Sequence, residues 1–100
     1  MSVSEMDSLR KRIDDLDNDI VALLAERFKV TEEIGVYKAK HDLNPQDRSR
    51  EADKFAMLSE RAENYGLNPK YAVDIYRCIM DIVINRHLEI KASPDQISKS

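Results

Sequence analysis

The chain has 100 residues and a net charge of −3, because 16 lysines and arginines are interspersed with 19 aspartates and glutamates. This balance excludes the basic footprint of a nucleic-acid-binding protein and the polybasic patch of a membrane-surface protein. Only two glycines, three prolines and one cysteine occur, so the composition favours helix over sheet and excludes an internal disulfide. No apolar stretch is long enough for a signal peptide or a membrane span, and we expect an all-α, cytoplasmic protein.

The first forty or so residues are predicted to form one long amphipathic helix. Apolar residues recur there at alternating steps of four and three, which defines a heptad seam. The seam comprises Leu9, Ile13, Leu16, Ile20, Leu23, Val30, Ile34 and Tyr37. Such a helix spans ~50 Å, whereas a compact domain of this length has a radius of gyration near ~13 Å, so partner helices must cover the seam.

Two shorter helices are expected after a connection that ends at Asn44-Pro45. Asn44 is predicted to cap the second helix, with Pro45 in its first turn, and Gly66 to end it in a left-handed C-cap. Asn68-Pro69 then supplies an N-cap and a first-turn proline for the third helix. We therefore expect three helices, the first much longer than the others.

Arg27 occupies a position of the seam where a heptad requires an apolar side chain. It follows Leu23 by four residues and precedes Val30 by three, so we expect it to be partly buried. A buried guanidinium needs a carboxylate partner, because an unpaired buried charge is costly. That partner is either another side chain, in a structural or register-setting ion pair, or an anionic ligand.

Two further cations, Lys38 and Arg10, are compared with Arg27 by their distance along the helix and by the face on which they lie. Lys38 lies three turns later on nearly the same helix face, about 16 Å along the axis, so both side chains can reach one ligand. Alternatively, Lys38 is a solvated lysine favoured by the helix dipole. Arg10 lies about 25 Å before Arg27, so it can join the same site only across an interface with an antiparallel partner chain. Otherwise Arg10 is an exposed arginine of the first turns.

Charged residues also gather where the second helix begins. The helix dipole explains Asp47 and Glu51 there, but it disfavours Arg50, which an anionic ligand beside the helix N-terminus would explain. In the third helix, His87 lies one turn after Val83 on the same face. His87 is either a donor in a site or a partly exposed histidine near the end of a helix.

Taken together, these residues resemble the all-helical chorismate mutases over Leu9 to about His87. The resemblance is carried by Leu9-Arg10, Ile13-Asp14, Leu16-Asp17, Leu23-Leu24, Arg27, Lys38, Asp47, Arg50-Glu51 and Gly66-Leu67. It implies one helical domain over residues 1–100, with a polar, frayed tail from about residue 92. It also implies an intertwined homodimer of three helices per chain, in which residues of both chains form each of two active sites.

The activity implied by the resemblance is the Claisen rearrangement of chorismate to prephenate in aromatic amino-acid biosynthesis. This isomerase reaction uses no cofactor, no metal, no general base and no covalent intermediate, so catalysis comes from positioning and electrostatics. By position, Arg10 of the partner chain and Arg27 bind the carboxylates of the substrate. Lys38 contacts a carboxylate and the ether oxygen, and Glu51 accepts from the ring hydroxyl. Asp47 and Arg50 line the same pocket.

Two positions depart from the family pattern. The best-known members carry a serine and, one turn later, a glutamine that donates to the ether oxygen, where this chain has Val83 and His87. His87 can still donate, and an imidazolium stabilises developing negative charge better than a neutral ring. We therefore count Arg27, Lys38 and His87 as the catalytic candidates.

The departures leave alternatives open. The substrate is chorismate, isochorismate with release of pyruvate, or an amino-substituted chorismate. A different class of protein, a non-catalytic helical dimerisation module in which Arg27 sets the register, also fits the pattern.

Overall fold

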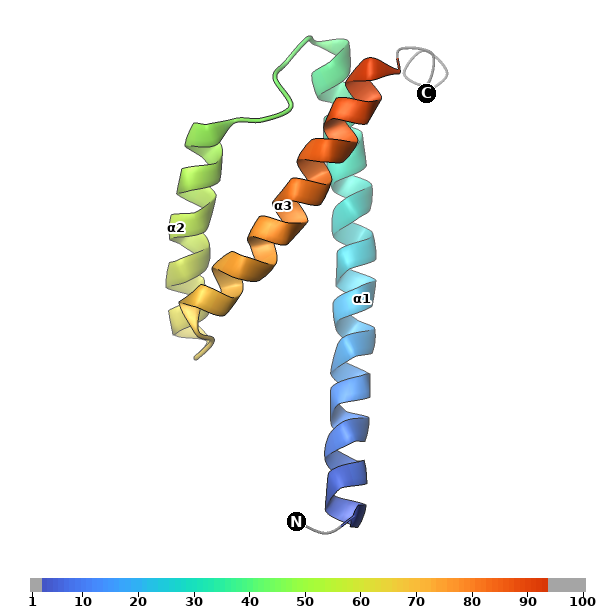
Figure 1. Ribbon diagram of the computed structural model, residues 1–100, viewed down its shortest axis with the longest axis vertical. Coiled ribbons are helices and arrows are strands. Elements are labelled where there is room, and N and C mark those ends of the chain that lie inside the picture. Colours follow the sequence, from blue (N-terminus) through green and yellow to red (C-terminus); the bar gives the residue numbers. More distant parts are fainter. Residues whose placement is uncertain (1–2, 94–100) are drawn as a thin grey trace. The chain divides into compact units, whose positions relative to one another are not determined.

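The computed structural model describes residues 3–93, which form three α-helices (Figure 1). They are α1 (Val3–Lys40), α2 (Arg48–Asn64) and α3 (Pro69–Ala92), and residues 3–93 contain no strand. This confirms the all-α class and the very long first helix. None of the helices in the described range has the length and apolar character needed to cross a membrane. The expected polar tail lies outside the described residues, apart from Ala92 and Ser93.

The chain divides into two compact units, Met1–Thr31 and Glu32–Ser100. The first unit contains the N-terminal part of α1 and no other helix in its described range. The second contains the last turns of α1 together with α2 and α3.

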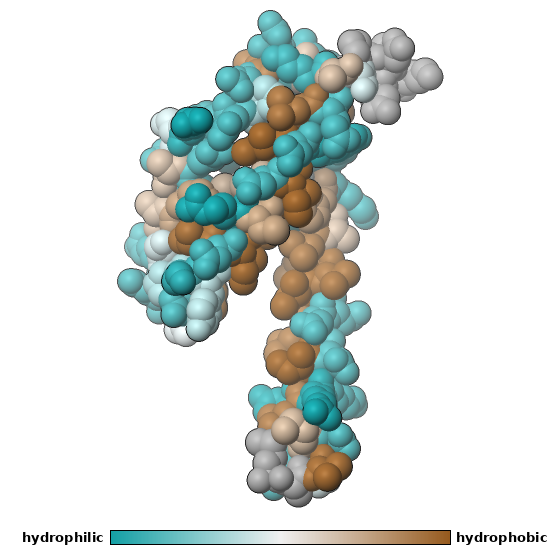
Figure 2. All heavy atoms as spheres, viewed as in Figure 1, coloured by the Kyte–Doolittle hydropathy of each residue, from teal (hydrophilic) through white to brown (hydrophobic). Residues whose placement is uncertain are grey.

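The first unit leaves its apolar seam exposed. Six of the predicted seam residues belong to this unit, and between 38% and 70% of their surface is accessible. They are Leu9, Ile13, Leu16, Ile20, Leu23 and Val30. Apolar side chains are visible at the surface of this part of the chain in Figure 2. The predicted heptad face therefore exists, and most of it stays open to solvent in the single chain.

The second unit has a small core in which α2 packs against α3 (Figure 1). The buried apolar side chains of these two helices are Leu58, Ala62, Ala72, Ile79 and Ile90. They are four residues apart in α2 and seven and eleven residues apart in α3, which are close to whole numbers of helical turns and place them on one face of each helix. From α1, Gly35 is the buried residue.

The turn between α2 and α3 follows the prediction from the sequence. Gly66 has a φ of +72°, and the Leu67 amide donates to the Ala62 carbonyl at 2.8 Å. This is the left-handed Schellman ending that satisfies the last carbonyls of a helix. The Asn68 side chain then accepts from the Lys70 amide at 2.9 Å, with Pro69 in the first turn of α3.

The predicted start of α2 was wrong by one turn. The helix begins at Arg48, and its N-cap is Asp47, whose carboxylate accepts from the Arg50 amide at 3.1 Å. The Asn44 side chain instead accepts from the Gln46 amide at 2.9 Å, two residues on. Asparagine forms this local turn as readily as it caps a helix, so the Asn-Pro signal marked the connection and not the helix.

Replacing Gly66 by alanine is expected to lower the free energy of unfolding by about 1–2 kcal/mol, because L-residues are strained in the left-handed region. A Cβ there would meet no atom within 4 Å, so the cost would come from the backbone alone. Chemical denaturation measures the change. Gly66→Asn is the matched control, and it should cost less because asparagine tolerates this conformation. Equal losses for the two variants would contradict the explanation.

Candidate active site

The eight side chains predicted to form the site are divided between the two units. Arg10 and Arg27 lie on α1 in the first unit, where Arg10 is exposed and Arg27 is half-buried, as its seam position predicts. The other six lie in the second unit. They are Lys38, Asp47, Arg50, Glu51, Val83 and His87.

Lys38 lies in the last turn of α1, and its side chain contacts the connection to α2. Its half-buried side chain donates from Nζ to the Pro45 carbonyl at 3.4 Å. Its own carbonyl accepts from the Leu43 amide at 2.8 Å, across a turn in which Asp42 has a φ of +52°. The ending of α1 thus places the Lys38 ammonium at Pro45, which is two residues before Asp47, the N-cap of α2.

Three of the predicted residues meet at the start of α2. Asp47 caps the helix through the Arg50 amide, and the half-buried Glu51 accepts from the Gln46 side chain at 3.4 Å. Arg50 also borders a shallow hollow along α2, which is lined by Ser49, Arg50, Asp53, Lys54 and Met57. The hollow therefore brings a second cation, Lys54, beside Arg50, and no feature of the sequence had marked Lys54.

His87 is buried, which rules out the alternative of a partly exposed histidine. Only 4% of its surface is accessible, whereas Val83, one turn earlier on α3, is half-buried. The imidazole packs on α1 at Gly35. A Cβ built on Gly35 would lie 2.6 Å from Cδ2 and 3.0 Å from Nε2 of His87. This contact joins the last turns of α1 to α3.

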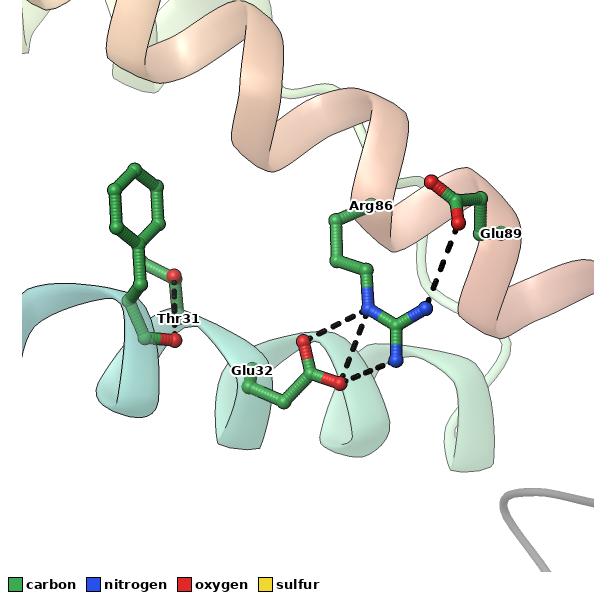
Figure 3. A network of polar contacts seen from close by, with 5 residues as sticks. Thr31, Glu32, Arg86 and Glu89 are labelled. Carbon is green, nitrogen blue, oxygen red and sulfur yellow. Dashed lines mark hydrogen bonds and ion pairs between the residues drawn. The ribbon is translucent and has the colours of Figure 1, made fainter. Parts of the chain in front are cut away.

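Beside this contact, Arg86 and Glu32 form a forked ion pair between α3 and α1 (Figure 3). Nε of Arg86 donates to Oε2 of Glu32 at 2.9 Å, and Nη2 donates to Oε1 at 2.5 Å. Glu89 approaches the same guanidinium at 3.6 Å from one turn further along α3. Two parallel N–H···O bonds fix the orientation of both side chains as well as their distance.

The ion pair changes the acid–base behaviour of both partners. The hydrogen bond from Arg86 lowers the pKa of Glu32 below its ordinary value of 4.5, against the opposing effect of partial burial. Electrostatic interactions with Arg86 and His87 lower this pKa further. The same hydrogen bond raises the pKa of Arg86.

Glu32, Gly35 and Arg86 were not predicted from the sequence. Gly35 carried a usable signal, because a glycine inside a predicted helix needs a packing or functional reason. Glu32 and Arg86 carried no such signal, because the partners of this ion pair are 54 residues apart and no periodic pattern in the sequence links them. Among residues 3–93, no group of three or more His, Cys, Asp or Glu side chains is arranged to hold a metal ion.

The fold and the predicted site define a small helical protein whose cationic side chains suit an anionic ligand. The chain matches the chorismate mutase type II family over residues 9–88, and it belongs to that family. It is 33% identical over 78 residues to the T-protein of Enterobacter agglomerans, which covers 78% of this chain and 21% of that protein. It is 36% identical over 94 residues to the bifunctional chorismate mutase/prephenate dehydratase of Aquifex aeolicus, which covers 91% of this chain and 26% of that protein.

The chain thus spans about a fifth to a quarter of the length of these relatives. The resemblance inferred from the spaced residues is confirmed at the level of the family. All eight predicted site residues lie within the matched range.

Replacing Glu32 by glutamine is expected to destabilise the protein at neutral pH and to matter less in acid. A carboxyl whose folded-state pKa is lowered stabilises the fold above its ordinary value of 4.5 and loses this effect as the pH falls through the lowered value. The measurement is the difference in unfolding midpoint between wild type and variant, at about pH 7 and about pH 3.5. Glu33→Gln, at the exposed neighbouring position, should show no such trend. A difference for Glu32→Gln that is independent of pH would contradict the prediction.

Proposed function

We propose that this chain catalyses the rearrangement of chorismate to prephenate. The observation that carries the proposal is the match to chorismate mutase type II over residues 9–88, which includes every residue of the predicted site. The T-protein and the bifunctional enzyme are longer, so the proposal concerns the activity that this family name describes and not the whole function of either relative.

The chemistry of the reaction agrees with the side chains present. The rearrangement is pericyclic, so it needs neither a proton acceptor nor a covalent intermediate. The protein has to hold the folded conformer of the substrate and stabilise the negative charge that develops on the ether oxygen. Arginine forks suit planar carboxylates, and a lysine or imidazole N–H suits a single oxygen.

In the proposed site, Arg27 and the partner chain's Arg10 bind the two carboxylates of chorismate. Lys38 contacts one carboxylate and the ether oxygen, and His87 donates to the ether oxygen from α3. At the start of α2, Glu51 accepts from the ring hydroxyl, while Asp47 and Arg50 line the pocket. Val83 supplies an apolar wall where the family pattern has a hydroxyl.

The proposed assembly is a homodimer with two shared sites. The exposed seam of the first unit supports it, because six large apolar side chains at heptad positions remain accessible in one chain. A second copy offers the same seam, and two-fold symmetry makes such a patch self-complementary. This arrangement also gives Arg10, which is exposed in the single chain, a place in a site.

The decisive experiment is turnover by the purified protein of chorismate, isochorismate and an amino-substituted chorismate, with the products identified by chromatography. We expect prephenate from chorismate. Pyruvate release from isochorismate, without prephenate formation, would show that isochorismate is the substrate and would leave the proposed site residues unchanged. A stable dimer that turns over none of the three would favour the non-catalytic dimerisation module.

Shared sites predict that two inactive variants restore activity when mixed. In a heterodimer of Arg10→Ala and Lys38→Ala chains, one site carries both changes and the other carries neither. Random subunit exchange makes half of the dimers mixed, so the mixture should reach about a quarter of wild-type activity. The matched control mixes Arg10→Ala with the double variant Arg10→Ala/Lys38→Ala, which should restore nothing. Absence of recovery after verified exchange would contradict shared sites.

A further inference from the structure

Gly35 lies inside α1, where a glycine needs a reason. Its backbone is ordinary helix, since Gly66 is the glycine with positive φ. Glycine destabilises a helix interior relative to alanine, because it loses more conformational freedom on folding. Local conformation therefore does not explain Gly35, and the explanation must lie in what packs against it.

His87 and Ile90 take up the space that a side chain on Gly35 would need. A Cβ there would lie 2.6 Å from Cδ2 of His87, 3.0 Å from its Nε2 and 2.9 Å from Cδ1 of Ile90. The imidazole is 4% exposed and Ile90 is 2% exposed, so neither can turn toward solvent without opening the packing. The terminal methyl of Ile90 can shift by a rotamer change, whereas the imidazole is rigid and moves as a whole.

The Glu32–Arg86 fork holds the two helices together beside this contact. Glu32 lies one turn before Gly35 on α1, and Arg86 directly precedes His87 on α3. Its bidentate geometry fixes orientation as well as distance (Figure 3). The ring is therefore held between a rigid backbone surface and an anchored helix.

We infer that Gly35 is a positioning residue for His87: its missing side chain lets the Cδ2–Nε2 edge of the imidazole lie against α1, which sets the orientation of the ring for the reaction. The inference rests on the proposed function, in which His87 donates to the ether oxygen. Hydrogen bonds weaken steeply as their angle closes, so a tilted ring donates poorly even when it stays in the site.

The activity test compares Gly35→Ala with wild type under saturating and limiting chorismate. We expect kcat to fall about tenfold while KM changes by less than about twofold, because the lost interaction belongs to the transition state. In a His87→Gln background the same change should lower kcat by less than about threefold, since a flexible amide avoids the added methyl. A full loss in that background would show that the methyl does not act through the ring, and would overturn the inference.

Gly66→Ala is the matched control, because it adds the same methyl where no atom lies within 4 Å. It should lower stability and leave kcat of the folded protein unchanged. If Gly35→Ala alone does not fold, the double variant Gly35→Ala/His87→Gln decides: a folded, active chain supports the inference, and an unfolded one overturns it.

A second readout does not depend on activity. The chain has two histidines, so the ring resonances of His87 can be assigned in an NMR spectrum by removing those of His41 with His41→Asn. Gly35→Ala should shift the Cδ2–H and Nε2 resonances of His87, and Gly66→Ala should not. Unchanged His87 resonances would overturn the inference, as would shifted resonances with unchanged kcat. If the wild type turns over no substrate, the proposed function fails, and the NMR experiment alone decides whether Gly35 fixes the ring.

Discussion

The apolar seam of α1 is the constraint on which the rest of the protein depends. Its six residues in the first unit remain substantially exposed in the single chain. Covering each half-exposed leucine or isoleucine contributes on the order of 1 kcal/mol, so the uncovered stripe is comparable with the ~5–15 kcal/mol that stabilises a whole domain. The core of one chain is correspondingly small, because it is made chiefly by α2 and α3. In the proposed homodimer, the surface that stabilises the two chains is also the surface that brings Arg10 to the proposed site.

Most of the fold could be predicted because its signals are local. The heptad spacing predicted α1, and the Gly66 and Asn68-Pro69 signals predicted the turn between α2 and α3. The start of α2 was misplaced because Asn44 and Asp47 both have side chains that bond nearby amides. Asn44 forms a turn within the connection, and Asp47 caps the helix. Composition could not decide between them, since both residue types favour both roles.

For the candidate site, the sequence predicts a set of charged residues, but it did not predict Glu32, Gly35 and Arg86, which pack beside His87. Arg27 is predicted as a site residue because a cation on a heptad seam conflicts with the pattern around it, and it lies within the range that matches the family. The burial of His87 could not be predicted, because it depends on the approach of α3 to α1 at Gly35. The Glu32–Arg86 fork joins residues that are close only after folding. Periodicity describes one helix at a time, whereas these features belong to pairs of helices.

The space above Gly35 also bears on how such a chain can evolve. A side chain at position 35 and a bulky ring at position 87 compete for the same volume, so neither position can drift freely while the other is unchanged. Replacement of the histidine by a slimmer residue would come first, and only then would alanine become acceptable at position 35. The order of substitutions along a lineage would thus be constrained by a contact between two helices, and the glycine would persist wherever the ring does.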